Sequence, residues 1–328
     1  MGARRSVWIA ILTGLLATAL AASCVVADDT TPGAPAPTQP VLPAWAQVQE
    51  QTIPADYLAA VKTTAQKFFD QLKAGNKDAA VALLAPESAS APGPDPLSFY
   101  DPRQLLTLVT QLSDPVLVDP GLVGVRAYSR WQGNGPMQGR AVGKTIGIYF
   151  RMADKQPLIY LAGAGAPPAR DLATAVPEGL FWPWWETTRM SPDDPGYAHK
   201  VASTLGLIST NWPSWDNDPD KCWANVQAWW AAQDKLYGTY RVTSMVTAAR
   251  LVAMSGDSEI VDRPFSFVST DKQFQVTYRF RMVRTPPPTD PHRGGRFNGW
   301  QIADICTVSV QALPAPPPMK PTATAAPE

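Results

Sequence analysis

The stretch QFQVTYRFRMVR, residues 273–284, alternates polar and apolar side chains from Gln273 to Met282. Its apolar members are Phe274, Val276, Tyr278, Phe280 and Met282. Because successive side chains of a strand point to opposite faces of a sheet, this pattern predicts a β-strand with one face in a hydrophobic core. The other face carries Arg279 and Arg281, which form either a solvated sheet face or a basic site for an anionic partner.

The sequence on both sides of this strand predicts two helices and several more strands. Apolar residues recur at helical spacing at Ala198, Val201, Leu205 and Ile208, and then, after Pro219, at Trp223, Val226, Trp229, Trp230 and Leu236. Residues 240–252, 259–268 and 299–310 have the composition of strands. Helices followed by an antiparallel meander indicate an α+β domain, which we place at residues 197–312.

The first half of the chain repeats this order and predicts another α+β domain at residues 56–166. Residues 57–74 predict an amphipathic helix, and Asn76 is placed to cap a short second helix that ends before Pro86. Asp101 and Pro102 precede apolar residues that predict a third helix, through Leu105, Leu108, Val109 and Leu112. Strands are predicted near residues 123–131, 146–152 and 158–163.

A connector rich in proline and tryptophan, residues 167–196, separates the two predicted domains. It contains Trp182, Trp184 and Trp185. These side chains fill the seam between the domains, since tryptophan buries a large area, or they form a ligand-stacking or interface patch.

The N-terminus has the composition of an export signal. Arg4 and Arg5 precede an apolar run at residues 7–27, and the basic residues stay on the cytoplasmic side when such a run enters a membrane. Three outcomes are open for residues 1–27: acylation of Cys24 in a segment that resembles a bacterial lipobox, cleavage after Ala27, or retention as a membrane anchor. Each one places the rest of the chain outside the cytoplasm, on the membrane or secreted.

Composition supports a tethered, globular, extracytoplasmic body. The 328 residues are 45% hydrophobic, and many of the 34 prolines lie in residues 28–55 and 313–328, which are predicted to be a disordered tether and tail. With 28 basic and 28 acidic residues, the chain has no global charge to attract nucleic acid. Its expected partners are the membrane, through the N-terminus, and other envelope proteins.

Two cysteines remain in the predicted second domain. Cys222 and Cys306 form an even pair in a compartment that permits disulfides, so the sequence predicts a bridge between them. The alternative is two separate buried thiols.

Two segments resemble a known superfamily. AVKTTAQKFFDQLKAGNKDAAVALLAP, residues 60–86, resembles the opening helices of extracytoplasmic nuclear transport factor 2-like domains. GWQIAD, residues 299–304, is similar to the last strand of that superfamily. The resemblance implies two cone-like α+β domains, each with helices packed on a curved antiparallel sheet, and the superfamily includes enzymes, ligand-binding domains and scaffolds.

No catalytic, cofactor-binding or metal-binding motif is found in the sequence, so we expect a non-enzymatic binding or scaffolding protein. His199 and His292 have no Cys or Glu at metal-ligand spacing. One alternative is an enzyme whose cone pocket uses an acid or base such as Asp304 or Asp262. The other is an assembly subunit of a conjugation or type IV secretion machine, which has the same layout of anchor, spacer and tandem domains.

The fate of the export segment can be read from the mature N-terminus. We expect mass spectrometry to find a lipid-modified Cys24 as the first residue. An unmodified chain that starts at Asp28 would refute the lipoprotein interpretation, and an uncut N-terminus would indicate an anchor.

Overall fold

The computed structural model of the protein describes most of the chain after the predicted export segment. The described residues are 40–89, 97, 100, 105–133, 138–153, 156–163, 172–209, 219–240, 248–256, 258–269, 271–284 and 299–314. Residues 1–39, which include Cys24, and residues 315–328 lie outside them. Within the described ranges, no helix is both long and apolar enough to cross a membrane.

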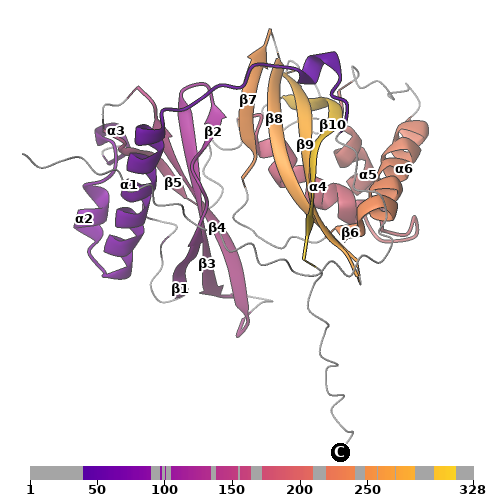
Figure 1. Ribbon diagram of the computed structural model, residues 1–328. Coiled ribbons are helices and arrows are strands. Elements are labelled where there is room, and N and C mark those ends of the chain that lie inside the picture. The colour runs from indigo at the N-terminus through magenta and orange to yellow at the C-terminus, as the bar shows by residue number, and fades with distance from the viewer. Residues whose placement is uncertain are drawn as a thin grey trace, which may run out of the picture. The chain divides into compact units, whose positions relative to one another are not determined.

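The first sheet, sheet A, follows three helices (Figure 1). The helices are α1 (Ala55–Lys73), α2 (Lys77–Val81) and α3 (Pro86–Ala89). The strands are β1 (Leu105–Leu112), β2 (Val116–Asp119), β3 (Leu122–Gln132), β4 (Ala141–Arg151) and β5 (Ile159–Gly163). They are antiparallel in the order β1-β3-β4-β5, and β2 also pairs with β3.

The amphipathic pattern of α1 explains how this helix packs. Its buried side chains are Val61, Ala65, Phe68, Phe69 and Leu72. They follow helical spacing and contribute to the hydrophobic core, as the sequence predicts. The helix ends before Gly75, whose positive φ of 77° suits a residue without a Cβ. Asn76 is the N-cap residue of α2, as predicted, but its side chain makes no capping hydrogen bond and its amide donates to Gln71 Oε1 at 3.1 Å.

The predicted third helix of this half is wrong, because residues 105–112 form strand β1. Leu105 pairs with Trp131 and Leu112 with Ala127 across the β1–β3 ladder. The spacing of apolar residues in LLTLVTQL fits a helix, but Thr107, Val109 and Thr110 are β-branched and favour a strand. Pairing with the long strand β3 decides between the two.

The second sheet, sheet B, also follows three helices. These are α4 (Ala175–Thr187), α5 (Tyr197–Leu205) and α6 (Pro219–Tyr237). The strands are β6 (Thr239–Tyr240), β7 (Arg250–Ser255), β8 (Ser258–Val268), β9 (Gln273–Arg284) and β10 (Trp300–Leu313). They are antiparallel in the order β10-β9-β8-β6, and β7 pairs with β8. The α+β fold class with two antiparallel sheets is therefore confirmed.

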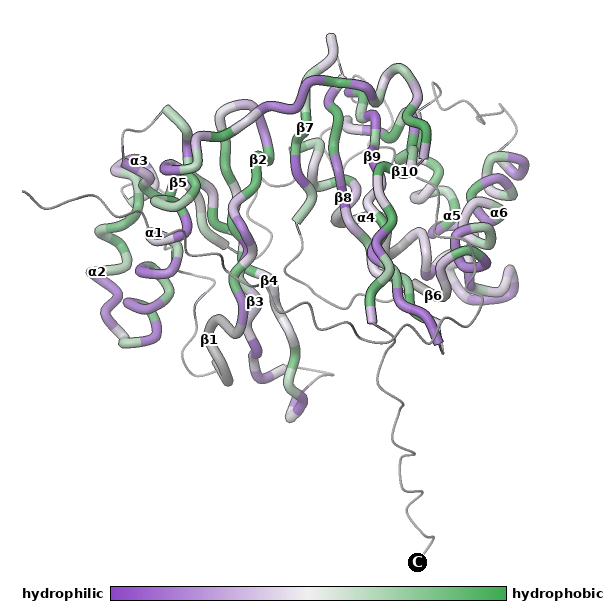
Figure 2. The backbone as a smooth tube through the Cα atoms, in the orientation of Figure 1, coloured by the Kyte–Doolittle hydropathy of each residue, from purple (hydrophilic) through white to green (hydrophobic). Residues whose placement is uncertain are grey.

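Strand β9 is the alternating segment from which the second domain was predicted. Hydrophilic and hydrophobic residues follow one another along its trace in Figure 2. Val276, Tyr278, Phe280 and Met282 are all buried. The apolar face of β9 therefore lies in the core, as the sequence predicts.

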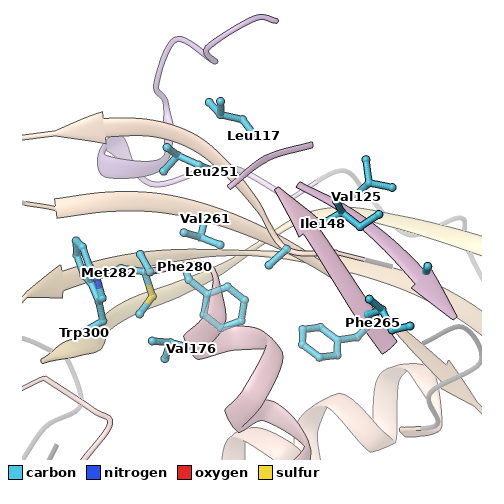
Figure 3. Close-up of a cluster of buried hydrophobic side chains, with 14 of the residues drawn as sticks. Leu117, Val125, Ile148, Val176, Leu251, Val261, Phe265, Phe280, Met282 and Trp300 are labelled. Atoms are coloured by element: carbon cyan, nitrogen blue, oxygen red, sulfur yellow. The ribbon is translucent and has the colours of Figure 1, made fainter. Parts of the chain in front are cut away.

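Part of the predicted connector is helical, since α4 occupies residues 175–187. This helix contacts α5 and β10, and its residue Trp184 is fully buried. Figure 3 shows Val176 of α4 close to Phe280 and Met282 of β9. The sequence gives a weak helix signal here, because proline in a helix interior removes a hydrogen bond and α4 contains Pro183.

One continuous cluster of buried side chains includes residues of both sheets. Both sheets lie in one compact unit, Gln39–Glu328. Strand β2 of sheet A lies against β7 of sheet B, and Figure 3 shows Leu117 close to Leu251 there.

The predicted disulfide is not formed, and Cys222 and Cys306 both carry thiols. Cys306 pairs with Arg279 across the β9–β10 ladder, so its side chain lies on the Arg279 face of sheet B. Cys222 belongs to α6, which packs on the opposite face of the sheet, where Tyr278 donates a hydrogen bond to Gln233. The sheet therefore stands between the two sulfur atoms.

Alkylation of the chain without reductant tests this placement. After denaturation we expect iodoacetamide to label both Cys222 and Cys306. In the folded protein at pH 8 we expect slow labelling of Cys306, because burial raises the pKa of its thiol to about 11 and leaves little thiolate. Labelling that requires prior reduction would show a bridge after all.

Candidate functional site

The two faces of sheet B have different chemistry. On one face, which we call the helix face, Tyr278 donates a hydrogen bond to Gln233 Oε1 of α6 at 2.6 Å. The ring of Trp229, also on α6, lies 5.3 Å from the Tyr278 ring. The other face carries Arg279, and the candidate site lies there.

A segment from the N-terminal part of the chain covers this second face. We call residues 43–51 the strap. It contains the 3-10 helix η1 (Ala44–Ala46), and in Figure 1 it runs past the ends of β7 and β8 before the chain enters α1. The side chains of Trp45 and Val48 pack against a buried cluster of sheet B, formed by Val252, Ala253 and Ile260.

Hydrogen bonds add to this apolar contact. The backbone N–H of Gln51 donates to the carbonyl oxygen of Val252 at 2.9 Å. Ala46 is fully buried. The prediction of a disordered spacer as far as residue 55 is therefore wrong for the strap.

A buried ion pair lies beneath the strap, between neighbouring strands. Arg279 of β9 is paired with Asp262 of β8 in the ladder. Its Nε donates to Asp262 Oδ1 at 2.7 Å and its Nη2 donates to Oδ2 at 2.8 Å. The two side chains are only 4% and 2% exposed. This is the bidentate geometry in which a guanidinium binds a carboxylate most strongly.

Two further N–H groups of Arg279 bind the strap. Its Nη1 donates to the carbonyl oxygen of Ala46 at 2.7 Å, and its Nη2 donates to Glu50 Oε1 at 3.2 Å. A buried guanidinium needs an acceptor for each N–H it takes out of water. The strap supplies acceptors that sheet B lacks.

A second arginine closes the network. Arg250 of β7 donates through Nη1 to Glu50 Oε2 at 3.0 Å and through Nη2 to Asp262 Oδ2 at 3.0 Å. We call Glu50, Arg250, Asp262 and Arg279 the strap clamp. It contains two cations and two anions, so its formal charge is zero.

The clamp shifts the pKa values of Glu50, Arg250 and Arg279 in the directions expected for ion pairs. The hydrogen bond from Arg250 holds the pKa of Glu50 below its ordinary value of 4.5, and Arg279 contributes to the same shift. The hydrogen bond to Asp262 raises the pKa of Arg279. Glu50 therefore stabilises the strap above about pH 4.5, and that stabilisation is lost as the pH falls through its lowered pKa.

Both sequence interpretations of Arg279 are wrong, because this side chain is neither solvated nor open to an anionic partner. Its charge is balanced by Asp262 and Glu50. Arg281 lies on the same face, half-buried, and pairs in the ladder with Asp304 of β10.

Trp184 and Trp185 of α4 do not form an open stacking patch either. Trp184 is fully buried. Trp185 is half-buried, and the guanidinium of Arg189, which also forms an ion pair with Asp234, lies 4.3 Å from the centre of its ring. The side chain of Trp182 lies outside what the structure describes.

The two acids proposed for catalysis have structural partners. Asp262 is 1% exposed and is bound by two arginines. Asp304 accepts a hydrogen bond through Oδ1 from the N–H of Ile305 at 2.9 Å. Among the residues described, no group of three or more His, Cys, Asp or Glu side chains could hold a metal ion.

Sequence reasoning missed Glu50 and Arg250. Glu50 lies in a segment assigned to the disordered tether, and 229 positions separate it from Arg279. No local pattern connects residues that far apart. The one available signal was the position of Arg279 and Asp262 on facing strands with opposite charges.

No protein-family model and no curated protein matches the chain. Fold and site define it as an α+β protein with two antiparallel sheets and an N-terminal strap clamped to the second sheet.

Removing one partner of the buried pair tests the clamp. We expect Arg279→Met to lower the free energy of unfolding by about 3–5 kcal/mol, because it leaves Asp262 and the Ala46 carbonyl buried with fewer donors. Urea unfolding of residues 28–328 measures the change.

Lys62→Met is the matched control, since its pair with Asp114 has side chains that are 52% and 87% exposed. We expect this control to change the same free energy by less than about 1 kcal/mol. Equal effects of the two substitutions would show that the clamp contributes no more than a surface ion pair.

Proposed function

We propose that the chain is an extracytoplasmic, membrane-tethered binding or scaffolding protein without catalytic activity. The observation that carries the proposal is the strap clamp. The strap lies within the predicted tether, residues 28–55, so the clamp determines which part of the folded body the rest of the tether is tied to.

The clamp ties the spacer to sheet B, although the next element along the chain, α1, packs with sheet A. Residues 28–42, between the export segment and the strap, reach roughly 45 Å when extended as polyproline II. Without the clamp, the free chain would continue as far as α1. A scaffold that must hold its surfaces at a set height above a membrane benefits from such a fixed point.

The packing of the helix face supports a role without catalysis. Four large side chains are fully buried there: Trp230, Tyr278, Phe267 and Phe280. A catalytic cone in this fold type would need a cavity lined by titratable groups between helix and sheet. Aromatic side chains occupy the part of this face around Tyr278, and Asp262 lies on the opposite face within the clamp. The buried acid of the helix face, Glu259, pairs instead with Met254 and Met282.

The resemblance to nuclear transport factor 2-like domains is part of this proposal. In that superfamily the same arrangement of helices and sheet serves enzymes and scaffolds, so the fold does not choose between them. Here the candidate acids Asp262 and Asp304 are already bound within the protein, which favours a scaffold over an enzyme. The expected ligands of such a scaffold are other envelope proteins.

Fractionation of the native host tests the location. We expect the full chain to sediment with membranes, to require detergent for release, and to be digested by protease added outside the cytoplasmic membrane. The matched control lacks residues 1–27 and is expected in the soluble cytoplasmic fraction. A full chain that resists external protease until the cells are lysed would contradict the proposal.

Complementation of a deletion strain separates scaffold from enzyme. We expect Asp304→Asn to restore the wild-type phenotype, because a scaffold needs no acid or base at that position. We expect an exported chain without a membrane attachment to fail. The reverse result, failure of Asp304→Asn and success of the unattached chain, would indicate an enzyme.

A further inference from the structure

A buried carboxyl group lies on sheet B away from the strap clamp. Glu259 is the second residue of β8 and is 7% exposed. It pairs with Met282 on β9 and with Met254 on β7, and it lies on the same face of β8 as Val261. None of the strap contacts involves it.

Sheet A brings a second carboxyl group to the same place. Asp119 is the last residue of β2, the strand that lies against β7. Its negative charge acts on Glu259. The other charged group that acts on Glu259 in the described part of the chain is Arg284, which is exposed at the end of β9. Two acids from different sheets are therefore close enough to interact electrostatically where β2 contacts β7.

Burial raises the pKa of Glu259 to about 7, and the charge of Asp119 adds to this shift while Arg284 opposes it. Burial also raises the pKa of Asp119. A protonated Glu259 can remain beside Asp119 without repulsion. An ionised Glu259 places a second negative charge beside Asp119 in a contact where Glu259 is 7% exposed, and opening the contact relieves the repulsion by admitting water.

We propose that the contact between β2 and the β7–β8 hairpin is a proton-controlled latch, closed while Glu259 is protonated and loosened when Glu259 ionises. The latch joins sheet A to sheet B at their adjoining strands. It acts independently of the membrane tether and of any ligand.

The direction follows from proton linkage. The pKa of Glu259 is about 7 in the folded protein and about 4.5 as an unperturbed group, so the closed contact binds more protons than the open one between these values. Closing is therefore favoured at low pH, and it weakens as the pH rises from about 4.5 to about 7. Above that range the effect is constant.

Hydrogen exchange of the full chain in detergent micelles tests the latch. The measurement compares backbone amides of β2 and β7 at pH 5.5 and pH 8.5, after correction for the intrinsic pH dependence of exchange. We expect protection in these strands to fall by a factor on the order of 10 to 100 at the higher pH, since one unit of pKa difference corresponds to a factor of ten. Amides in the middle of the β3–β4 ladder should keep their protection.

Two variants assign the effect to the carboxyl pair. Glu259→Gln is expected to remove the pH dependence in β2 and β7. Asp119→Asn is expected to move the midpoint to lower pH, because it removes the negative charge that favours protonation of Glu259. The matched control, Asp304→Asn, changes a carboxyl group on β10 and should leave the midpoint where it is.

Three results would overturn the latch. One is equal protection of β2 and β7 at both pH values in the wild type. Another is an unchanged pH dependence in Glu259→Gln. If that variant does not fold, an Asp119→Asn midpoint equal to that of the wild type decides against the latch.

Discussion

The buried charge of Arg279 is the constraint on which the arrangement of sheet B depends. The Arg279 side chain is 4% exposed and has lost most of its hydration, so its N–H groups need acceptors from the protein. Asp262 supplies acceptors from the neighbouring strand, and the strap supplies the others through Ala46 and Glu50. Satisfying one side chain thus fixes the path of a segment more than 200 positions away.

The two faces of strand β9 lie in different environments. Alternation along β9 sends Tyr278 and Phe280 toward the helices and sends Arg279 toward the strap. A shift of the pairing by one residue would exchange the two sets and bury charges among aromatic rings. The register of β9 is therefore determined from both faces, by packing on one and by ion pairing on the other.

The sequence predicts those parts of the fold that depend on local periodicity. Helix α1 and strands β3, β8, β9 and β10 have unambiguous patterns and were predicted correctly. Strand β1 was predicted wrongly, because the spacing of its apolar residues fits a helix as well as a strand. Pairing with β3 makes it a strand. Helix α4 was missed because Pro183 normally ends a helix.

The candidate site was harder to predict, since its partners come from distant parts of the chain. The sequence around a charged residue on a predicted strand does not show whether the folded protein buries that residue. For Arg279 that depended on the strap, whose proline-rich context indicated disorder. The predicted disulfide between Cys222 and Cys306 was wrong for a related reason. The spacing of two cysteines along the chain does not reveal which face of a sheet each one occupies.

Strand β7 connects the clamp with the contact between the sheets. Arg250 of this strand belongs to the clamp, and the strand itself lies against β2 beside Glu259 and Asp119. The two features respond to pH in opposite directions. The contribution of Glu50 disappears as the pH falls below about 4.5, whereas ionisation of Glu259 weakens the contact with β2 as the pH approaches about 7. Between these values β7 is held on both sides, by the strap across its face and by sheet A along its edge. At higher pH the ladder with β8 and the strap still hold β7, while the proposed latch to sheet A is loosened.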